Sequence, residues 1–541
     1  MPADLADDTA RHDEAALRDD TAPRDRTAGH DGGAVLHSDV EELLDALDAD
    51  RGREALVHRD RRITAGELVD AVHRLAHVLD DRVEPGRVVA LLAGNTPEAV
   101  VARLAVTLLG AGITQPHEGL SAAATARIVA DVEAPLVLAD ADAAPTAEPV
   151  LALVDGVPVL WLGAHDGGTD LLEAAATASA APVRGRARPH DVEQIRHTGG
   201  TTGHPKGITY TFDHHRRGAE MRRRAGGFGA GGTGGRLLVA TPVAHVGGAM
   251  ADRALADGGT VVLQDVFEPG AFLAAIERER ITHTFLLPPL IYRLLDHPDL
   301  DRTDLSSLRS LVYGGAPANP RRIAEALRRI GPVFTQFYGQ TEAGGISVLT
   351  PEEHRDPALL GPVGRPIPTT TIAIRDPEGH DVAPGTRGEL WVRTGMEMDG
   401  YWKQPELSAA TVVDGWVRTG DVARQDAGGY LHLLDRVKDM IVVVGGHVYT
   451  SELEDLLMEH PAVRQAAVFG VPDEDGTETV HAAVVTDGSG PAVDELTGLV
   501  ADRAGAMYVP ATVEFVERIP LTGIGKTDKK RLRAELAGHP R

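Results

Sequence analysis

Cysteine is absent from this 541-residue chain, aromatic residues make up only 4%, and acidic residues outnumber basic ones by 80 to 54. Without cysteine there is no disulfide bond, no thiolate-bound metal and no cysteine nucleophile. The formal net charge of −26 leaves no global positive field to gather phosphates, so we expect no nucleic-acid partner and no attraction to an anionic membrane. No apolar run reaches the roughly eighteen residues of a spanning helix, so we expect no membrane-embedded segment.

The rest of the composition is that of an ordinary globular protein, with 43% hydrophobic and 25% charged residues. The chain is too long for one hydrophobic core, so at least two domains are expected. Residues 1–35 mix Asp, Arg, Ala and Thr without an apolar period and lack the continuous apolar stretch of a signal peptide. We therefore predict a disordered acidic tail over 1–35 and a cytoplasmic protein.

Local signals predict alternating strands and helices. Ser38 with Glu41, and Thr64 with Glu67, have the spacing of capping boxes that open helices. A short strand over 88–92 leads into a helix from Pro97 to about Leu109, and five further segments resemble strands: Leu136–Leu138, Val159–Leu162, Leu237–Ala240, Val261–Leu263 and Leu311–Tyr313. This alternation favours an α/β fold with largely parallel sheets.

The pattern changes at about Thr371. Short strands divided by Gly, Pro and Asp turns follow, which predicts a small β-barrel-like subdomain; they are Ile372–Arg375, Gly388–Val392 and Tyr430–Leu434. A compact strand, helix and strand pattern comes after the segment Asp435–Asp439. We therefore predict a large N-terminal domain of α/β subdomains over 36–435 and a small, mobile α+β domain over 436–541.

The most informative stretch is a glycine-rich loop over residues 197–207, with the sequence His-Thr-Gly-Gly-Thr-Thr-Gly-His-Pro-Lys-Gly. Its glycines allow backbone N–H groups to point into one concavity, and Lys206 supplies a cation for a polyphosphate. A flexible glycine turn is the alternative. The loop is not a P-loop, because Pro205 separates Gly203 from Lys206 and no Ser or Thr follows the lysine.

This loop and six later motifs resemble those of the acyl-adenylate-forming ligases, which include acyl- and aryl-CoA synthetases, firefly luciferase and nonribosomal peptide adenylation domains. The later motifs occur in the family's order: Pro242-Val243-Ala244-His245, Tyr313-Gly314-Gly315-Ala316-Pro317, Tyr338-Gly339-Gln340-Thr341-Glu342, Gly415-Trp416-Val417-Arg418-Thr419-Gly420-Asp421, Asp435-Arg436-Val437-Lys438-Asp439 and Pro520-Leu521-Thr522-Gly523-Ile524-Gly525-Lys526. The resemblance implies an AMP-forming acid–thiol ligase, closest in look to stand-alone bacterial acyl- and aryl-CoA ligases. Such an enzyme uses ATP to activate a carboxylic acid as acyl-AMP, releases pyrophosphate, and transfers the acyl group to CoA.

The resemblance also implies a nucleotide site. The phosphate cradle would consist of Lys206 with Thr198, Gly199, Gly200, Thr201, Thr202 and Gly203. Asp421 would accept hydrogen bonds from the ribose hydroxyls, assisted by Arg436. The adenine pocket would be formed by Gly314, Gly315, Ala316, Tyr338, Gly339 and Gln340.

The catalytic roles implied by the family need placed charges and no protein nucleophile. Thr341 would donate to the α-phosphate, and Glu342 would bind Mg²⁺, which prefers carboxylate and phosphate oxygens. Lys526 would bridge the incoming carboxylate and the α-phosphate, where charge concentrates in the transition state. Lys438 would be the hinge about which the small domain rotates, and His245 would gate or pack on the acyl group.

Each of these residues also has a simpler structural interpretation. Thr341-Glu342 could begin a helix, because Glu favours the positive end of the helix dipole. Asp421 could be a turn residue, and Arg436 could form an ion pair between domains. Lys526 could begin a solvated basic helix, and solvent exposure is our expectation for the three basic residues after it, Lys529, Lys530 and Arg531.

The acyl pocket is predicted to be apolar, which suits an aryl or a medium- to long-chain acyl group. Its walls by family position are Val246–Ala251, Leu286–Leu290 and Gly344–Ile346. Asp252-Arg253 interrupts this pattern, and an ion pair turned toward solvent is favoured over recognition of a substrate amino or hydroxyl group. The His214-His215 pair has no carboxylate or Cys near it in the sequence, so we expect no metal site there and predict that the pair lies on the surface.

The acceptor of the acyl group has three candidates: CoA, a separate carrier protein, and nitrite in a diazotase that acts on an aryl amine in natural-product biosynthesis. His197 before the glycine-rich loop, and Thr450 where many relatives carry Pro, depart from the family pattern and bear on thiol preference. The alternative from a different functional class is a catalytically inactive protein that senses ATP or acyl groups. Against it stands the joint presence of four charged site residues, Lys206, Glu342, Asp421 and Lys526.

Overall fold

The computed structural model describes residues 35–117, 120–166, 168–198, 206–224, 234–443, 446–472, 478–488 and 490–536. These residues belong to one compact unit that begins at Val35. The predicted tail lies outside the described residues except for Val35, as do residues 199–203 of the glycine-rich loop. Within the described ranges, no helix is both long and apolar enough to cross a bilayer.

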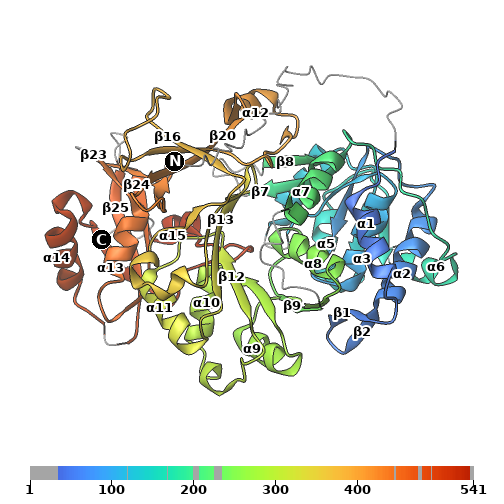
Figure 1. Ribbon diagram of the computed structural model, residues 1–541, viewed down its shortest axis with the longest axis horizontal. Coiled ribbons are helices and arrows are strands. Elements are labelled where there is room, and N and C mark those ends of the chain that lie inside the picture. The colour runs from blue at the N-terminus through green and yellow to red at the C-terminus, as the bar shows by residue number, and fades with distance from the viewer. Residues whose placement is uncertain are drawn as a thin grey trace, which may run out of the picture. The chain divides into compact units, whose positions relative to one another are not determined.

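A nine-stranded sheet forms one half of the α/β region (Figure 1). Its strands, in spatial order, are β15 (Arg365–Pro366), β14 (Gly344–Leu349), β13 (Phe334–Gln340), β12 (Ser310–Gly314), β11 (His283–Leu286), β9 (Arg236–Val239), β10 (Thr260–Leu263), β1 (Glu54–His58) and β2 (Arg61–Thr64). The strands from β13 to β1 run parallel, while β14, β15 and β2 add antiparallel edges. A parallel centre needs helices on both faces.

A seven-stranded sheet forms the other half. Its order is β18 (Gly400–Tyr401), β8 (Lys206–Thr211), β7 (Val192–Thr198), β4 (Gly112–Thr114), β3 (Val88–Leu92), β5 (Val137–Asp140) and β6 (Val159–Leu162). All five residues of β3 are buried, as expected for a central parallel strand covered on both faces. The predicted α/β class is the observed one.

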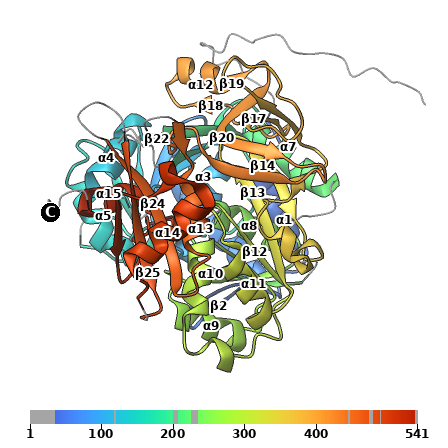
Figure 2. The same cartoon turned by 90° about the vertical axis from the view of Figure 1, so that its left-hand side faces the viewer.

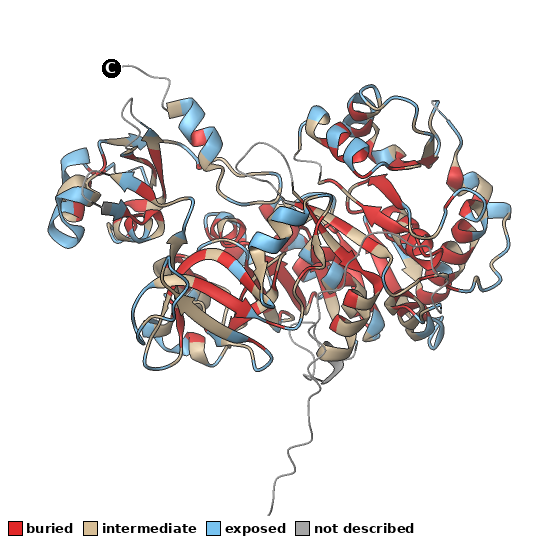
Figure 3. Ribbon diagram, turned by 90° about the horizontal axis from the view of Figure 1, so that it is seen from above, coloured by how far each residue is buried: buried red, intermediate tan, exposed pale blue. Residues whose placement is uncertain are grey.

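Helices cover both faces of the two sheets. Between the sheets lie α1 (Asp39–Asp48), α2 (Ala65–Leu79), α3 (Pro97–Leu108) and α8 (Val246–Ala256), whose apolar side chains share one core with β3, β9 and β10. The other face of the nine-stranded sheet packs against α9 (Pro269–Arg278), α10 (Pro288–Leu295) and α11 (Pro320–Arg329). The other face of the seven-stranded sheet packs against α4 (Ala122–Asp131) and α5 (Ala144–Leu151). Figure 3 shows the resulting buried strands beneath more exposed helices.

The remaining α-helices of this region are α6 (Leu171–Thr177), α7 (Phe212–Arg224) and α12 (Pro405–Thr411). Short 3₁₀ helices occur at Ala141–Ala143, Leu300–Arg302, Glu353–Arg355, Pro357–Leu359 and, later in the chain, Ala506–Tyr508. The region predicted to form a small barrel-like subdomain is a five-stranded antiparallel sheet, formed by β16 (Thr371–Arg375), β17 (Gly388–Arg393), β20 (Trp416–Gln425), β19 (Val412–Val413) and β21 (Leu431–Arg436). All its ladders are antiparallel.

The C-terminal elements form small sheets flanked by helices (Figure 2). The sheets consist of β22 (Ile441–Val443) with β23 (Gly446–Val448), and of β24 (Val463–Pro472), β25 (Glu478–Thr486) and β26 (Thr512–Phe515). The helices are α13 (Thr450–Leu457), α14 (Val493–Ala504) and α15 (Lys529–Leu536). Their apolar residues form cores of their own, so this part has the α+β character predicted for it.

Hydrogen bonds join these elements to the preceding part of the chain. Asn319 Nδ2 donates to Asp455 Oδ1 at 3.0 Å, and Arg321 donates to the backbone carbonyls of His460 and Val463. The Val437 N–H donates to the Gly420 carbonyl at 2.8 Å. Any rotation about the predicted hinge would therefore have to break a defined set of polar contacts.

Both predicted capping boxes are confirmed. The Ser38 hydroxyl accepts from the Glu41 N–H at 3.3 Å while Glu41 accepts from the Ser38 N–H at 3.0 Å, and Thr64 and Glu67 repeat this exchange. These contacts satisfy N–H groups that have no partner within the helix. The helix predicted from Pro97 ends one residue early, at Leu108, and the five further strand segments all fall on strands, with shifts of at most two residues at their ends.

Arg322 is a charged residue inside the α10–α11 packing, where its substitution should cost stability. It is 1% exposed and donates to Asp296 at 2.7 Å, to Glu325 at 2.8 Å and to the Tyr292 carbonyl at 3.1 Å. We expect Arg322→Met to lower the free energy of unfolding by about 3 kcal/mol, because it leaves these three acceptors without a hydrogen-bond donor. Urea denaturation measures this, with Arg302→Met as the matched control, since Arg302 is 80% exposed and an exposed ion pair contributes less than about 1 kcal/mol. Equal losses in the two variants would contradict the assigned role of burial.

Candidate active site

Thr341 and Glu342 lie in a tight hairpin turn between β13 and β14. The Ala343 N–H donates to the Gln340 carbonyl at 3.2 Å, and Gly344 follows with φ at +73°, a conformation that favours glycine. The alternative that Thr341-Glu342 begins a helix is therefore wrong. The turn instead presents both side chains at the end of a central strand.

Two tyrosines from neighbouring strands hold this turn. Tyr210 donates through its hydroxyl to the Thr341 carbonyl, and Tyr401 donates to Glu342 Oε1 at 3.0 Å. The Nζ of Lys206 lies 5.3 Å from the centre of the Tyr401 ring, a cation–π distance. Lys206 of the glycine-rich loop is thus brought close to the Thr341–Glu342 turn. Neither tyrosine was anticipated, since nothing in its local sequence marks it.

The carboxylate of Asp421 accepts hydrogen bonds from three side chains. Its Oδ2 accepts from the Tyr338 hydroxyl at 2.5 Å and from Gln340 Nε2 at 2.6 Å, while Oδ1 accepts from Arg436 Nε at 2.9 Å. The alternative that Asp421 is a turn residue is wrong, because it lies within β20, directly after Gly420 at φ +67°. It is 5% exposed. The structure therefore joins three separate motifs, those of Tyr338, Asp421 and Arg436, around one carboxylate.

The residues at the C-terminal end of β12 leave a narrow space beside Tyr338. A side chain on Gly314 would place its Cβ 2.0 Å from the Phe337 carbonyl oxygen of β13, so only glycine fits between the two strands. Gly315 has φ at +78°, and Gly314, Gly315 and Ala316 line the same cavity as Tyr338. This arrangement suits a flat ring, as predicted for the adenine pocket.

Lys526 sits on a short C-terminal loop that turns back into the cavity. The Thr522 N–H donates to the Lys526 carbonyl at 2.7 Å, and Gly525 has φ at +82°. Surrounding protein atoms lower the pKa of Lys526 by removing water from its ammonium group, and repulsion from Arg436 lowers it further. Attraction to the carboxylates of Asp421 and Glu342 opposes this shift. Lys526 is therefore in electrostatic contact with the groups predicted to hold ribose and Mg²⁺. It is not the start of a helix, since α15 begins at Lys529.

Cations converge on this region of an otherwise acidic protein. The pKa of Lys438 is lowered by its surroundings and by repulsion from Arg436, with a further contribution from Lys206. The three lysines Lys206, Lys438 and Lys526 thus share their surroundings with Arg436. Such an arrangement favours a polyanion.

The predicted acyl region contains neutral histidines. His245 precedes α8, and its Nε2 is buried with no hydrogen-bond partner among the described residues. Burial, with repulsion from Arg196, His117 and Lys526, lowers the pKa of His245 to about 3. Its ring centre lies 5.8 Å from that of His117, whose pKa burial also lowers. Both rings are therefore uncharged near neutral pH and can pack on a substrate.

A single cavity of about 2740 Å³ connects these groups. Of the predicted walls, it is lined by Val246, Gly248, Ala249, Met250, Leu287, Pro289, Gly344 and Gly345. The rest of those three ranges does not line it; Ala251, Leu286 and Leu290, for example, are core residues. Of the predicted phosphate cradle, Gly199–Gly203 lie outside the described residues, and Thr198 is placed by its backbone alone, opposite Lys206 in the β7–β8 ladder.

Three structural expectations for polar residues are wrong. Asp252 pairs with Arg103 of α3 and not with Arg253, and it lines the cavity. His214 is 4% exposed, and His215 faces the carboxylate of Glu193 at 2.9 Å. Lys529 is not solvated, because it pairs with Glu454 at 2.7 Å. In each case the partner comes from a distant part of the chain.

The fold, together with a cavity on which several cations converge, fits an enzyme that binds a polyanion. The family model described as AMP-binding enzyme matches residues 44–402, and that of the AMP-binding enzyme C-terminal domain matches residues 452–526. The chain belongs to this family, the acyl-adenylate-forming ligases. The resemblance noted from the motifs is thereby confirmed.

The relatives of this chain include CoA ligases and an amide bond synthetase. The medium/long-chain-fatty-acid–CoA ligase FadD8 of Mycobacterium tuberculosis is 35% identical over 511 residues, covering 91% of this chain and 89% of its own. A feruloyl-CoA synthase of Amycolatopsis sp. is 36% identical over 488 residues, covering 88% and 95%. Among solved structures, the amide bond synthetase McbA of Marinactinospora thermotolerans is 40% identical with a TM-score of 0.83, covering 92% of this chain and 100% of its own.

Proposed function

We propose that the protein activates an aryl or medium- to long-chain carboxylic acid with ATP and transfers the acyl group to the thiol of CoA. The observation that carries this proposal is the convergence of Lys206, Lys526 and Arg436 on the Thr341–Glu342 turn and Asp421 within one cavity. Both reactants of the first step are anions. A catalyst must therefore neutralise charge and align the carboxylate with the α-phosphorus.

In the first half-reaction the acid's carboxylate oxygen attacks the α-phosphorus, and pyrophosphate leaves. Lys526 stabilises the charge that builds between the two groups, and Thr341 donates to the α-phosphate. Lys206 and the cradle Thr198–Gly203 hold the β- and γ-phosphates. Asp421 accepts from the ribose hydroxyls by exchanging part of its present hydrogen-bond set, while Arg436 keeps its charge balanced.

The donor set also fits Mg²⁺. Glu342 offers a hard carboxylate oxygen on the turn that faces the lysines, and such oxygens are the ligands that Mg²⁺ prefers. When bound there, the ion would neutralise part of the phosphate charge. Tyr401, which donates to the same carboxylate, would orient it.

In the second half-reaction the thiol sulfur attacks the acyl carbonyl, and AMP leaves. We propose that residues 436–541 rotate about Lys438 to withdraw Lys526 and admit the thiol. The exposed position of Lys438 beside the Val437–Gly420 hydrogen bond supports a hinge there. ATP and CoA are intracellular reactants, which supports the predicted cytoplasmic location.

Amide formation is a second candidate for the last step. The relative with 40% identity is an amide bond synthetase, whereas the CoA ligases named above are 35% and 36% identical. The same acyl-adenylate would then be attacked by an amine nitrogen in place of a thiol sulfur. The first half-reaction and its residues are unchanged.

Product analysis tests both candidates. Purified protein is supplied with ATP, Mg²⁺ and a panel of aryl and alkyl acids, and with CoA, a primary amine, a carrier protein or nitrite in turn. We expect acid-dependent release of pyrophosphate in every arm and acyl-CoA in the CoA arm, identified by mass spectrometry. Absence of pyrophosphate and AMP across the whole panel would refute the ligase proposal, and amide without thioester would replace the first candidate by the second.

A further inference from the structure

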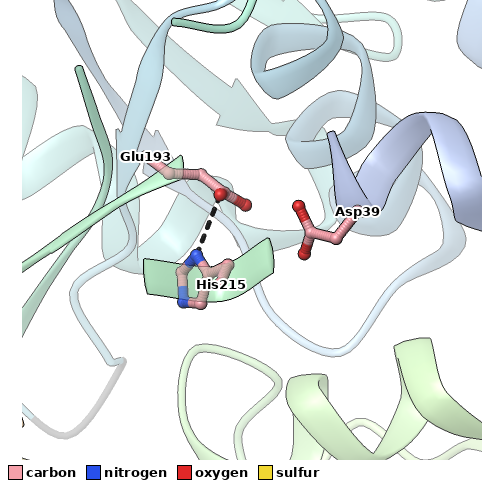
Figure 4. A group of neighbouring side chains, drawn as sticks. All are labelled: Asp39, Glu193 and His215. Atoms are coloured by element: carbon pink, nitrogen blue, oxygen red, sulfur yellow. Dashed lines mark ion pairs between the residues drawn. The ribbon is translucent and has the colours of Figure 1, made fainter. Parts of the chain in front are cut away.

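Five charged or titratable side chains from five elements meet beside the cavity and take no part in the nucleotide site. They are Asp39 of α1, Arg103 of α3, Glu193 of β7, His215 of α7 and Asp252 of α8, and all five line the cavity. Figure 4 shows Asp39 facing Glu193 and His215. We call this set the carboxylate cluster.

The members of the carboxylate cluster are close enough to act together. One ligand atom from each of Asp39, Glu193 and His215 lies within 4.8 Å of the other two. Glu193 Oε2 is 2.9 Å from His215 Nδ1, and Arg103 donates to Asp252. Arg103 is also in electrostatic contact with Glu193 and Asp39. One guanidinium therefore pairs with Asp252 and interacts electrostatically with two further carboxylates, those of Glu193 and Asp39.

The backbone directs Glu193 into the cluster. The β7–β8 ladder changes register between Val192 and Gln194, so Glu193 occupies a β-bulge. Bulges re-aim a side chain and are common beside functional sites. As a result, Glu193 is only 6% exposed although it is ionisable.

In the carboxylate cluster, the positive charge of Arg103 does not balance the three carboxylates. Burial, followed by repulsion from Glu193, raises the pKa of Asp39 to about 7. Burial also raises the pKa of Glu193 to about 8, although Arg103 and Arg196 oppose the rise and Asp252 reinforces it. Asp39 Oδ1 is buried and accepts no hydrogen bond from the described residues. A donor that carries positive charge would satisfy this deficit.

The carboxylate cluster is connected to the reacting end of the cavity. Lys526 is in electrostatic contact with His245, His245 with Arg196, and Arg196 with Glu193. All four line the one cavity. An acid whose carboxylate lies at Lys526 can therefore direct the opposite end of its acyl group toward the cluster.

We propose that the acid substrate carries a protonated amine at the end remote from its carboxylate, and that Asp39, Glu193 and Asp252 bind this ammonium group. The proposal rests on the proposed function, because it names the substrate class of the same cavity. An ammonium offers three N–H donors and one positive charge. It would supply the donor that Asp39 Oδ1 lacks, while Arg103 stays paired with Asp252.

Matched acid pairs test this proposal. Pyrophosphate release is measured for aryl and alkyl acids of graded length that end in either an ammonium or a methyl group. For at least one length we expect kcat/KM to favour the amine by about tenfold or more, since a site built around hydrogen bonds discriminates against analogues that lack them. Release of pyrophosphate with methyl-ended acids and no amine preference at any length would overturn this proposal alone. Absence of release with all acids would overturn the ligase proposal as well.

Variants assign the preference to particular residues. Glu193→Gln and Asp39→Asn are each expected to reduce the amine-to-methyl ratio of kcat/KM by about tenfold. Asp257→Asn is the matched control, because Asp257 follows the last turn of α8 and pairs with Arg253 at 2.6 Å, outside the cluster. It should keep the wild-type ratio. Melting temperatures show whether each variant folds. If one of the two variants misfolds, the kcat/KM ratio of the other tests the assignment. Retention of the full ratio in a folded Glu193→Gln or Asp39→Asn protein would contradict the assignment.

The pH dependence of the ratio gives an independent readout. Asp39 and Glu193 lose their protons near pH 7 and 8, with Arg103, Arg196, His215 and Asp252 as the other charged or titratable groups facing them. An amine on an aliphatic carbon, as in these substrates, stays protonated over this range, like a lysine side chain. The amine-to-methyl ratio of kcat/KM should therefore rise from pH 6 to 9, because the two carboxyl groups gain negative charge. In Glu193→Gln only Asp39 still titrates, so the rise should be complete at a lower pH. A pH-independent ratio, or stoichiometric transition metal in the purified protein that Glu193→Gln removes, would overturn the proposal.

Discussion

Replacing Lys526 with Ala is expected to slow acyl-adenylate formation by about 100-fold or more, the effect of removing one group that stabilises a developing oxyanion. Lys526 reaches the cavity from a C-terminal loop and shares its surroundings with Asp421, Glu342 and Arg436. Its charge is the one that we propose to bridge the acid and the α-phosphate. Acid-dependent pyrophosphate release measures the first half-reaction directly.

The second half-reaction provides the internal control for this variant. Transfer to CoA from preformed acyl-AMP should be spared in Lys526→Ala, because the proposed rotation withdraws Lys526 before the thiol enters. Lys530→Ala removes the same charge from an exposed site in α15 and should leave both steps near wild type. Equal loss of both half-reactions in Lys526→Ala would contradict the two-conformation mechanism.

Replacing Glu342 with Gln is the other change with a large expected effect. It keeps the size of the side chain and the hydrogen bond with Tyr401, but it removes the negative charge that we propose to bind Mg²⁺. We expect kcat for pyrophosphate release to fall by about 100-fold. Millimolar Mg²⁺ should restore it only in part.

Calorimetry separates this metal role from a structural one. Mg²⁺ should strengthen ATP binding to the wild type and have a much smaller effect in Glu342→Gln. Glu352→Gln, an exposed glutamate beyond β14, is the matched control and should keep the wild-type Mg²⁺ response. An unchanged Mg²⁺ response in Glu342→Gln would reassign the metal to another ligand.

Sequence reasoning succeeded where the determining interactions are local. The Ser38 and Thr64 capping boxes depend on partners three residues away, and both were predicted and observed. The α/β alternation was predicted for the same reason, since apolar period and turn residues lie within each segment. The Thr341–Glu342 hairpin is a different case: these two residues alone favour a helix start, and the turn depends on the pairing of β13 with β14.

Features built from distant segments were missed. Asp252 was expected to pair with its neighbour Arg253, whereas its partner Arg103 is 149 residues away in the chain. His215 was assigned to the surface because Glu193, its carboxylate neighbour, lies on another element. Tyr401 reaches Glu342 only because β18 joins the sheet beside β8. Such pairings follow from how the sheets assemble, and the sequence near each residue carries no sign of them.

The hairpin that carries Thr341 and Glu342 has a consequence for how the gene can vary. Gln340 and Gly344 are opposite each other in the β13–β14 ladder, and Gly339 lies so close to the Gly344 carbonyl that a Cβ would approach it to 2.4 Å. One inserted or deleted codon between them would shift the register and reverse the faces of the following residues. Length variation among homologous genes should therefore be excluded from this turn, even where the connections on either side differ freely.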